Sequence, residues 1–575
     1  MSKLINLKNI FPVLGNLVSS YGRSDFNRDL FAGLTVGVIF IPQGMAYAML
    51  AGVPPIYGLY AGLFPLLLYA LFGTSRQLSI GPVAVSALLV LAGISTIAEP
   101  FSPEYITYVI LTGFCIGVLQ ILAGIFKLGF LVNFLSHPVI AGFSSAAAII
   151  IVISQLKDVF GFPIPRMETS AEYLLYAFSH LDETHWLTLS ICLGSLAIIY
   201  LLRYINKKIP AALLVAIVAT ALTYFFRWDQ EELSIIGDIS RGLPSFEMVE
   251  LDRKSILAVL PTVLTVAIIG TVECIGIAKV LEAKTKNHIV IPNRELIALG
   301  ISKTLGSLFQ AMPTSGSFSR SAVNHDAHAS TQISSIITVI LIALTLIFLT
   351  PFFYYMPLAV LAAIILQSVT GLFDYKEAIH LWKVHRLDFI MMMTTFVITL
   401  VLGIEEGVFA GVALSVVTVL YKSTKPHTAK LGNIPNTPFY RNVERFQDVE
   451  PVDEIIIIRF DDQLFFGNVS YFKERMKNYI AEHHTKPKYC LLDCGNIHDL
   501  DSSGAHGLQE IENYLLDQGI ELHVASVRGP MRDMLYKCGM MTEPHKHHMT
   551  VHAGVQTITG TAERTSFEQA MQKNR

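Results

Sequence analysis

The stretch TSGSFSRSAVNH, residues 314–325, places four serines around one arginine between two long apolar segments. A charged side chain at membrane depth costs about 3 kcal/mol on insertion scales, so such residues usually line a substrate or ion path. Arg320 is therefore a candidate functional residue. The alternative is a structural ion pair, in which a buried acid balances the charge.

The composition indicates a polytopic membrane protein. Of the 575 residues, 52% are hydrophobic and 15% are charged, whereas soluble domains carry roughly 25% charged residues. The net charge of -3 shows no basic excess, so nucleic acid is not an expected partner. An enzyme is not expected either, because the sequence contains no nucleophile paired with a base, no metal-ligand set and no nucleotide-binding loop.

Apolar segments of spanning length run almost without pause between residues 30 and 421, and a lipid bilayer is their expected environment. We expect fourteen spans. They cover residues 30–50, 53–72, 78–97, 105–126, 138–156, 186–202, 210–226, 256–281, 294–311, 317–328, 332–350, 357–371, 388–403 and 405–421.

The third and tenth spans are unlike the others. SIGPVAVSALLV (79–90) and SGSFSRSAVNH (315–325) carry Gly, Pro and Ser where an ordinary lipid-facing helix carries leucine. Each is third of seven in its half of the chain. Such paired broken spans predict a seven plus seven inverted repeat with a binding site at the midplane. Two kinked helices packed by small residues are the alternative, but they leave Arg320 unexplained.

The basic residues indicate the topology. Lysines and arginines gather on one set of alternating loops, while opposite loops such as AEPFSPEY (98–105) and TPFFYYMP (350–357) carry none. The positive-inside rule therefore places both termini in the cytoplasm, with the chain in the cell inner (cytoplasmic) membrane.

The C-terminal part has a different character. EIIIIRF (454–460), KYCLLD (488–493) and IELHVASV (520–527) have the length of strands and alternate with amphipathic helical patterns. They predict a small cytoplasmic α/β domain. The expected organisation is an N-terminal segment (1–29), a transport domain (30–421), a linker (422–452), the α/β domain (453–560) and a tail (561–575).

Several stretches resemble the sulfate permease (SulP) family. They are GLTVGVIFIPQGMAYAMLAGVPPIYGLYAGL (33–63), QLSIGPVAVSALL (77–89), LSHPVIAGFSSAAAIII (135–151), NRELIALG (293–300) and GSFSRSAVN (316–324). LLDCGNIHDLDSSGAHGL (491–508) resembles the STAS module, named after sulfate transporters and anti-sigma factor antagonists. The resemblance implies a core domain that moves against a gate domain, a homodimer, and secondary active transport of small oxyanions.

The two broken spans suggest how an anion is held. If each begins a helix near the midplane, their N-terminal amides present partial positive charge to one point. Arg320 then adds a full charge, and the resemblance places Gln43 and Tyr47 of the first span beside it. Interhelical hydrogen bonding is the alternative for those two residues. The substrate-binding candidates are Gln43, Tyr47, Val83, Ala84, Ser317, Phe318, Ser319 and Arg320.

Glu273 is the candidate for ion coupling. It lies deep in the eighth span, between Gly270 and Gly276, and a carboxyl group in low dielectric can gain and lose a proton. The family resemblance places the coupling acid here, which favours a proton, with sodium as the alternative; no cofactor is expected. Relatives commonly have asparagine at the position of Lys303, and we expect this lysine to extend to the membrane interface.

In the STAS-like domain, Ser502 and Ser503 precede a predicted helix. They are candidate phosphorylation sites, since related free-standing domains are phosphorylated at such a serine, but N-capping of the helix is the favoured expectation. A cytoplasmic regulator would bind this domain. His545, His547, His548 and His552 are expected to bind metal only adventitiously, so no metal site is predicted.

Proton-coupled sulfate uptake is the expected function, by an alternating-access movement of the elevator or rocking type. Bicarbonate or a C4-dicarboxylate is the alternative substrate, because a positive pocket with hydroxyls accepts any compact oxyanion. A membrane-anchored anion sensor that signals through the STAS-like domain is the alternative from another functional class.

Overall fold

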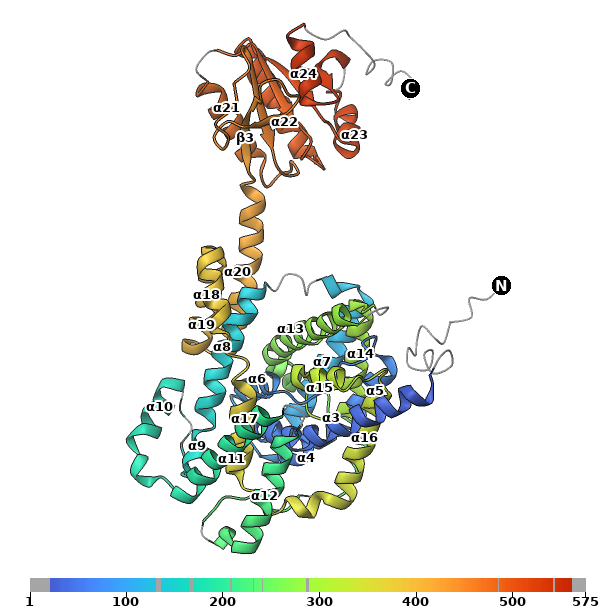
Figure 1. Ribbon diagram of the computed structural model, residues 1–575, viewed down its shortest axis with the longest axis vertical. Helices are drawn as coiled ribbons and strands as arrows, with labels where there is room; N and C mark the ends of the chain where they lie inside the picture. Colours follow the sequence, from blue (N-terminus) through green and yellow to red (C-terminus); the bar gives the residue numbers. More distant parts are fainter. Residues whose placement is uncertain are drawn as a thin grey trace, which may run out of the picture. The chain divides into compact units, whose positions relative to one another are not determined.

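The computed structural model describes residues 21–130, 136–165, 167, 169–206, 209–230, 232–239, 241–285, 289–483, 486–540 and 543–560. The chain forms two compact units, residues 1–415 and 416–575, which are described separately below (Figure 1). The first unit is helical, and the second contains a mixed β-sheet.

The first half of the helical unit contains the first seven expected spans. Each of them falls on one helix, on consecutive short helices or on an extended segment followed by a helix. The helices are α3 (Arg23–Leu50), α4 (Pro55–Tyr60), α5 (Phe64–Phe72), α6 (Ala84–Ile94), α7 (Pro103–Ile125), α8 (His137–Ser154), α9 (Leu156–Phe160), α10 (Ser170–Ser179), α11 (Trp186–Ile205) and α12 (Ala211–Phe226).

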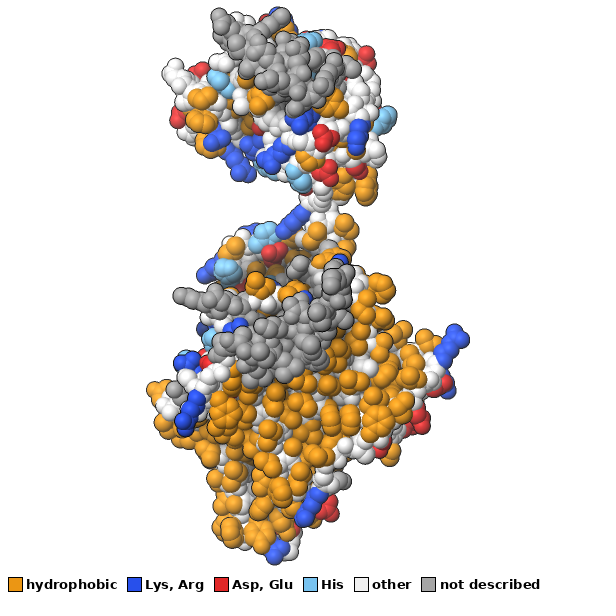
Figure 2. Space-filling view, turned by 90° about the vertical axis from the view of Figure 1, so that its right-hand side faces the viewer, with side chains coloured by type: hydrophobic (Ala, Val, Ile, Leu, Met, Phe, Trp, Pro, Cys, Tyr) orange, Lys and Arg blue, Asp and Glu red, His pale blue; other side chains and the backbone are white. Residues whose placement is uncertain are grey.

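The second half repeats this order of elements. Its helices are α13 (Arg253–Lys284), α14 (Pro292–Ser307), α15 (Phe318–Asp326), α16 (Ile333–Leu344), α17 (Leu358–Val369), α18 (Tyr375–Val384), α19 (Arg386–Val401) and α20 (Ile404–Thr424). Among the described residues, eight helices or pairs of consecutive helices are long and apolar enough to cross a membrane. Figure 2 shows one face of this unit covered by apolar side chains, as a lipid-facing surface requires.

The two broken spans meet through short strands. β1 (Ile80–Gly81) pairs antiparallel with β2 (Ser315–Gly316), and the amide of Ser317 donates a hydrogen bond of 3.0 Å to the carbonyl of Ser79. Helix α6 begins three residues after the end of β1, and helix α15 begins two residues after the end of β2. Extended backbone at membrane depth has no water to provide hydrogen bonds. The two segments therefore provide hydrogen-bond partners for each other's backbone groups. The prediction of two broken spans is confirmed.

Close helix contacts hold this arrangement together. Helix α7 packs on α14, and α3 packs on α16, so the first half of the chain interlocks with the second. A Cβ atom at Gly117 would lie 2.3 Å from the Thr304 hydroxyl, and one at Gly300 would lie 2.6 Å from the Gly117 carbonyl. Only small residues permit this approach. Helices α8, α11, α12, α17 and α19 form a second group of mutually packed helices.

The second unit contains a six-stranded sheet in the order β4-β3-β5-β6-β7-β8. Strands β5 to β8 are parallel, β3 and β4 are antiparallel additions, and helices cover both faces. The strands are β3 (Thr428–Asn433), β4 (Tyr440–Asn442), β5 (Ile455–Phe460), β6 (Tyr489–Asp493), β7 (Glu521–Ala525) and β8 (His547–His548). The helices are α21 (Val469–Ala481), α22 (Ser502–Asp517), α23 (Gly529–Lys537) and α24 (Val551–Ile558).

Burial on both faces explains the sequence of the central strand. In β5, Ile456 and Ile458 pack against α21 and α22, while Ile455 and Ile457 pack on the face that α24 covers. A parallel strand that is covered on both sides reads as a continuous apolar run rather than an alternating one. The predicted α/β domain with a central sheet is confirmed, but its expected start at residue 453 is too late, because β3 and β4 lie within the expected linker (422–452) and pair with β5.

Candidate anion-binding site

Arg320 occupies the first turn of α15 and is fully buried. Its Nη2 donates to the carbonyl of Pro82 at 3.0 Å, and its Nη1 donates to Oε1 of Gln43 at 3.4 Å. The guanidinium also lies 4.7 Å from the centre of the Phe40 ring. The side chain therefore points to the junction of β1 and α6 and to helix α3, rather than to lipid.

The positive charge of Arg320 is not balanced by these hydrogen bonds. Both acceptors, an amide oxygen and a backbone carbonyl, are neutral. The buried Nε has no hydrogen-bond partner among the described residues. Burying an arginine costs several kcal/mol unless an opposite charge accompanies it. An anion would provide that charge and accept the free N–H donor.

The local sequence positions this guanidinium between two helix starts. Ser317 is the N-cap of α15, and its hydroxyl accepts from the amide of Arg320 at 3.4 Å. Val83 is the extended N-cap residue of α6. Gly81 is required nearby, because a Cβ atom there would lie 2.9 Å from Nη2 of Arg320 and 2.5 Å from the Phe40 ring. The starts of α6 and α15 thus both lie next to Arg320, and the N-terminal amides of helices stabilise anions.

The structure brings some of the substrate-binding candidates together. Gln43 contacts Arg320 directly, and Val83 and Ala84 follow the Pro82 carbonyl that Arg320 contacts. The hydroxyls of Ser317 and Ser319 lie 3.4 Å apart. Of the eight candidates, Gln43, Tyr47, Val83, Ala84, Ser317 and Arg320 are buried, whereas Phe318 and Ser319 are exposed.

Glu273 lies on the helix that packs against β2. Its Oε2 accepts a hydrogen bond of 2.8 Å from the hydroxyl of Ser315. The neighbouring Cys274 accepts a bond of 2.9 Å from the amide of Gly316, which fixes α13 to the broken segment. Glu273 also interacts electrostatically with Arg320 and Lys303. Its side chain is only half-buried, so a proton or ion can reach it.

Lys303 does not extend to the membrane interface, so that expectation is wrong. Its side chain is buried, and its Nζ donates to Oε1 of Gln120 at 2.8 Å. Gln120 in turn donates from Nε2 to the Thr271 hydroxyl at 2.8 Å. The tight contact between α7 and α14 places the lysine within reach of this interior acceptor. Lys303 is therefore a second buried cation of the membrane unit.

Glu295 is a buried residue that the sequence did not identify as important. Its carboxylate accepts from the Tyr69 hydroxyl at 2.9 Å, the Thr74 amide at 2.7 Å and the Ser75 amide at 2.8 Å, and also from the Thr74 hydroxyl. These contacts fix α14 to the loop before β1. Glu295 lies in the stretch NRELIALG, which resembles the family, and in the first turn of a helix that begins with proline, but neither signal indicated its partners.

The start of α22 differs from the expectation. The N-cap is Asp501, whose Oδ1 accepts from the amide of Gly504 at 2.7 Å. The favoured expectation that Ser502 or Ser503 caps the helix is therefore wrong. Aspartate is as good a cap as serine, and it stands one residue earlier. Ser502 is exposed and Ser503 is half-buried.

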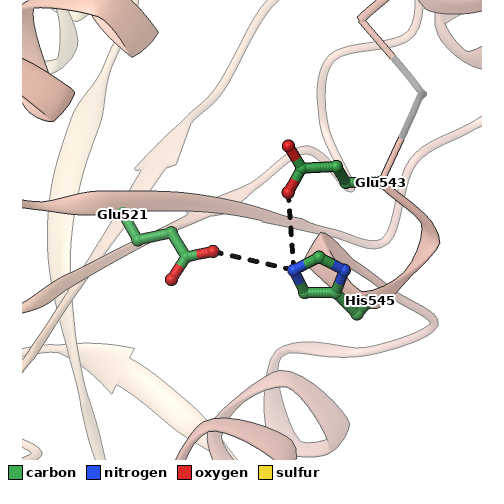
Figure 3. A group of neighbouring side chains, drawn as sticks. All are labelled: Glu521, Glu543 and His545. Atoms are coloured by element: carbon green, nitrogen blue, oxygen red, sulfur yellow. Dashed lines mark ion pairs between the residues drawn. The ribbon is translucent and has the colours of Figure 1, made fainter.

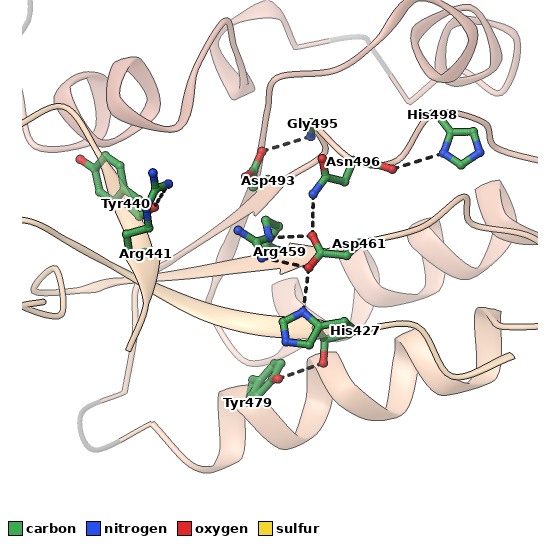
Figure 4. A network of polar contacts seen from close by, with 11 residues as sticks. His427, Tyr440, Arg441, Arg459, Asp461, Tyr479, Asp493, Gly495, Asn496 and His498 are labelled. Carbon is green, nitrogen blue, oxygen red and sulfur yellow. Dashed lines mark hydrogen bonds and ion pairs between the residues drawn. The ribbon is translucent and has the colours of Figure 1, made fainter. Parts of the chain in front are cut away.

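A second polar cluster lies at the ends of β5 and β6. Asp461 accepts from Arg459 at 2.6 and 2.9 Å, from Asn496 at 2.6 Å and from His427 at 2.7 Å (Figure 4). Burial opposes ionisation of Asp461, but these hydrogen bonds hold its pKa below the usual value. The cluster connects residues that follow the C-terminal ends of these two central strands.

Comparison with known proteins gives the family. Residues 26–395 match the sulfate permease family, and residues 447–554 match the STAS domain. The chain is 36% identical over 583 residues to Sulfate transporter 4.1, chloroplastic, of Arabidopsis thaliana, covering 98% of this chain and 84% of that protein. It is 33% identical to Sulfate transporter 1.1 of the same plant, covering 94% and 86%.

Two solved structures share the fold. The murine Solute Carrier 26 family member A9 anion transporter in the inward-facing state superposes with a TM-score of 0.89 at 24% identity, covering 97% of this chain and 96% of that one. The transmembrane domain of the cyanobacterial bicarbonate transporter BicA superposes with a TM-score of 0.60 at 23% identity, covering 68% and 98%. Together with the sequence matches, the broken spans and the C-terminal sheet, these show that the chain is a multi-pass membrane protein of the sulfate permease family, a transporter rather than an enzyme.

Proposed function

We propose that this chain is a secondary active transporter that carries sulfate together with protons. The observation that carries the proposal is Arg320, a fully buried cation whose two hydrogen-bond acceptors are both neutral. The curated relatives that match most of the chain are named as sulfate transporters, which favours sulfate over other oxyanions.

The pocket offers donors that suit a dianion. Arg320 contributes its charge and its unused Nε–H. Ser317 and Ser319 contribute hydroxyls, and α6 and α15 contribute their N-terminal amides. These fixed donors replace the water that sulfate loses on entry, which is the largest cost of binding a doubly charged ion at this depth. Gln43 orients the guanidinium, while Tyr47, Val83, Ala84 and Phe318 surround the ion.

Glu273 supplies the coupling. Among the described residues, its one side-chain hydrogen bond comes from Ser315 of β2, so a change in its protonation alters a contact with the broken segment. When protonated, it offsets one charge of the incoming sulfate. Sodium is the alternative coupling ion, and it would bind the ionised carboxylate. Alternating access then moves the loaded site across the membrane by an elevator or rocking movement.

The remaining assignments follow from the same arrangement. Residues 30–421 carry transport, and the STAS domain at 453–560 is regulatory, with Ser502 and Ser503 as candidate phosphorylation sites and a cytoplasmic regulator as its partner. The distribution of basic residues favours an orientation with both termini in the cytoplasm. The proposed location is the inner (cytoplasmic) membrane. A homodimer is the proposed assembly.

Transport by the purified full-length chain in liposomes tests the proposal. The membrane potential is clamped with potassium and valinomycin, the outside is made acidic, and the uptake of labelled sulfate is followed. We expect sulfate to accumulate above its outside concentration only while the proton gradient lasts. Arg320→Ala should lower the initial rate at least about 100-fold, because the dianion loses its buried counter-charge.

Arg386→Ala is the matched control, because Arg386 also lies in the first turn of a helix of this unit but stacks on Trp382 outside the pocket. It should retain the wild-type rate within about twofold. Binding of sulfate without flux would indicate a sensor instead. Flux that never exceeds the electrochemical gradient would indicate a channel, and equal rates in the two arginine variants would contradict the assigned site.

A further inference from the structure

Two segments of the STAS domain bring acidic and histidine side chains together at the edge of the sheet. Glu521 and His523 alternate along β7, so they lie on one face of that strand. Glu543 and His545 belong to the segment that leads into the edge strand β8. Figure 3 shows Glu521, Glu543 and His545 directed toward a common point.

The distances between these groups suit a tetrahedral metal ion. His545 Nε2 lies 3.4 Å from Oε2 of Glu543 and 3.8 Å from Oε1 of Glu521. Ligand atoms bound at about 2.0–2.1 Å to a tetrahedral ion are separated by about 3.4 Å. The three side chains would therefore need only small movements to bind one ion.

His523 provides a separate indication of a ligand. The residue is 5% exposed, and its Nε2 has no hydrogen-bond partner among the described residues. This nitrogen points to the cluster, 3.8 Å from Oε1 of Glu521.

The tautomer of His523 determines what Nε2 presents to Glu521. Its Nδ1 lies 2.9 Å from Nε2 of His548, and the two rings stack. If Nδ1 carries the proton and donates it to His548, then Nε2 presents a lone pair to the carboxylate. In that tautomer, the two facing acceptors can share one cation. A second ring nitrogen that donates to a fixed acceptor is also the usual arrangement of a metal-binding histidine.

We propose that Glu521, His523, Glu543 and His545 bind one divalent transition-metal ion, with Zn²⁺ as the preferred ion. Two imidazoles and two carboxylates suit Zn²⁺ better than Ca²⁺ or Mg²⁺, which prefer oxygen ligands alone. The ion would connect β7 to the segment before β8 and thereby fasten the edge of the sheet. This proposed metal site has no part in the proposed transport step.

Lys546 would compete with the ion for the two carboxylates. Its Nζ lies 2.7 Å from Oε2 of Glu543 and 3.5 Å from Oε1 of Glu521, so it neutralises both carboxylates. A metal ion must displace this ammonium group. Removal of the lysine is therefore expected to tighten metal binding, a result that a simple ion-pair cluster would not give.

The proposed site differs from the four-histidine cluster considered in the sequence. His547 and His548 form the edge strand itself, and His548 serves only to orient His523. His552 lies on α24, with its Nδ1 3.4 Å from the Tyr440 hydroxyl. Of the four histidines, only His545 contributes to the site, and its partners come from β7 and from Glu543.

Metal titration of the full-length chain in detergent, with any polyhistidine tag removed, tests the proposal. Zn²⁺ is titrated against a chromophoric chelator, and Co²⁺ serves as the spectroscopic probe. We expect one equivalent per chain and the intense visible absorption of four-coordinate Co²⁺. His523→Ala and Glu543→Gln should each weaken binding at least about tenfold, and Lys546→Ala should tighten it.

Two controls keep the result unambiguous. His506→Ala removes an exposed histidine that also pairs with a glutamate, 3.2 Å from Glu510 on α22, and it should leave the titration unchanged. Glu543 is exposed, so its variant folds even if His523→Ala does not. Failure to saturate at one equivalent, a six-coordinate Co²⁺ spectrum, or equal affinity in the wild type and Glu543→Gln would overturn the proposal.

Discussion

Glu273 and Glu295 are both carboxylates of the membrane unit, and they differ in the number of donors they receive. Glu295 accepts from two hydroxyls and two backbone amides around the loop before β1. Within the described part of the chain, Glu273 has a single side-chain donor, Ser315, and it keeps some accessible surface. A carboxylate that is fully satisfied is held in one state, whereas one with spare capacity can exchange a proton or an ion.

This difference suggests that the number of hydrogen-bond donors around an acid, rather than its depth, separates structural from functional acids in this fold. For the buried cations, the corresponding criterion is whether their N–H donors already have acceptors. Lys303 donates to an interior glutamine that is itself fixed by Thr271. Arg320 retains an unused N–H beside two helix starts. The following variants test the comparison, from the largest expected effect to the smallest.

Glu295→Gln should have the largest effect, and it should act on stability. The amide cannot accept all four donors, so buried polar groups lose their partner at a cost of about 3–5 kcal/mol. We expect the melting temperature in detergent to fall by about 5 °C or more. The folded fraction should still take up sulfate with the pH dependence of the wild type. Loss of that dependence would remove the distinction between the two acids.

Glu273→Gln should have the opposite profile. Its melting temperature should stay close to that of the wild type, because Gln can still accept from Ser315. Concentrative uptake should fall about 10- to 100-fold, and the remaining uptake should no longer depend on pH. Glu282→Gln is the control on the same helix, because Glu282 lies nine residues further along and pairs with Lys279 at 2.6 Å. Steeply pH-dependent accumulation in Glu273→Gln would exclude its role in coupling.

Lys303→Met should have a smaller effect on transport. An apolar side chain of similar length can replace a buried charge without loss of stability. We expect the apparent KM for sulfate to rise about three- to tenfold, because the pocket loses one nearby cation. Lys279→Gln, an exposed lysine on α13, should leave KM unchanged. An unaltered KM in Lys303→Met would make the lysine purely structural.

Asp461→Asn extends the comparison to the STAS domain, where water reaches the cluster. Because hydrogen bonds hold the pKa of Asp461 below its unfolded value, its contribution to stability is present above about pH 4 and is lost as the pH falls through the folded pKa. The variant should be less stable by about 1–2 kcal/mol at neutral pH. Hydrogen exchange of β5 in the full-length chain measures this, and exchange that matches the wild type at neutral pH would refute it.

The sequence was sufficient for the elements whose signals are local. Glycine, proline and serine within the spans at 78–97 and 317–328 indicated the extended segments before α6 and α15, and apolar runs indicated the strands of the C-terminal sheet. It also identified Arg320, because a charge at that depth is costly wherever its partners lie.

The sequence was insufficient where partners are distant along the chain. Glu295 bonds to Tyr69, which is 226 residues away, and Lys303 bonds to Gln120, which is 183 residues away. No local pattern reveals such an acceptor, so the lysine was expected to reach the interface. The prediction of the N-cap of α22 failed for a different reason. Asp501 and the two serines that follow it can all act as caps, and the backbone conformation determines which of them occupies the N-cap position.

The pairing of β1 with β2 has a consequence for biogenesis. Residues 80–81 find their backbone partners only at residues 315–316, in the other half of the chain. During synthesis, the first half therefore enters the bilayer with an unfinished strand whose amides have nothing to bond. The backbone groups of residues 80–81 therefore need other hydrogen-bond partners until translation passes residue 316.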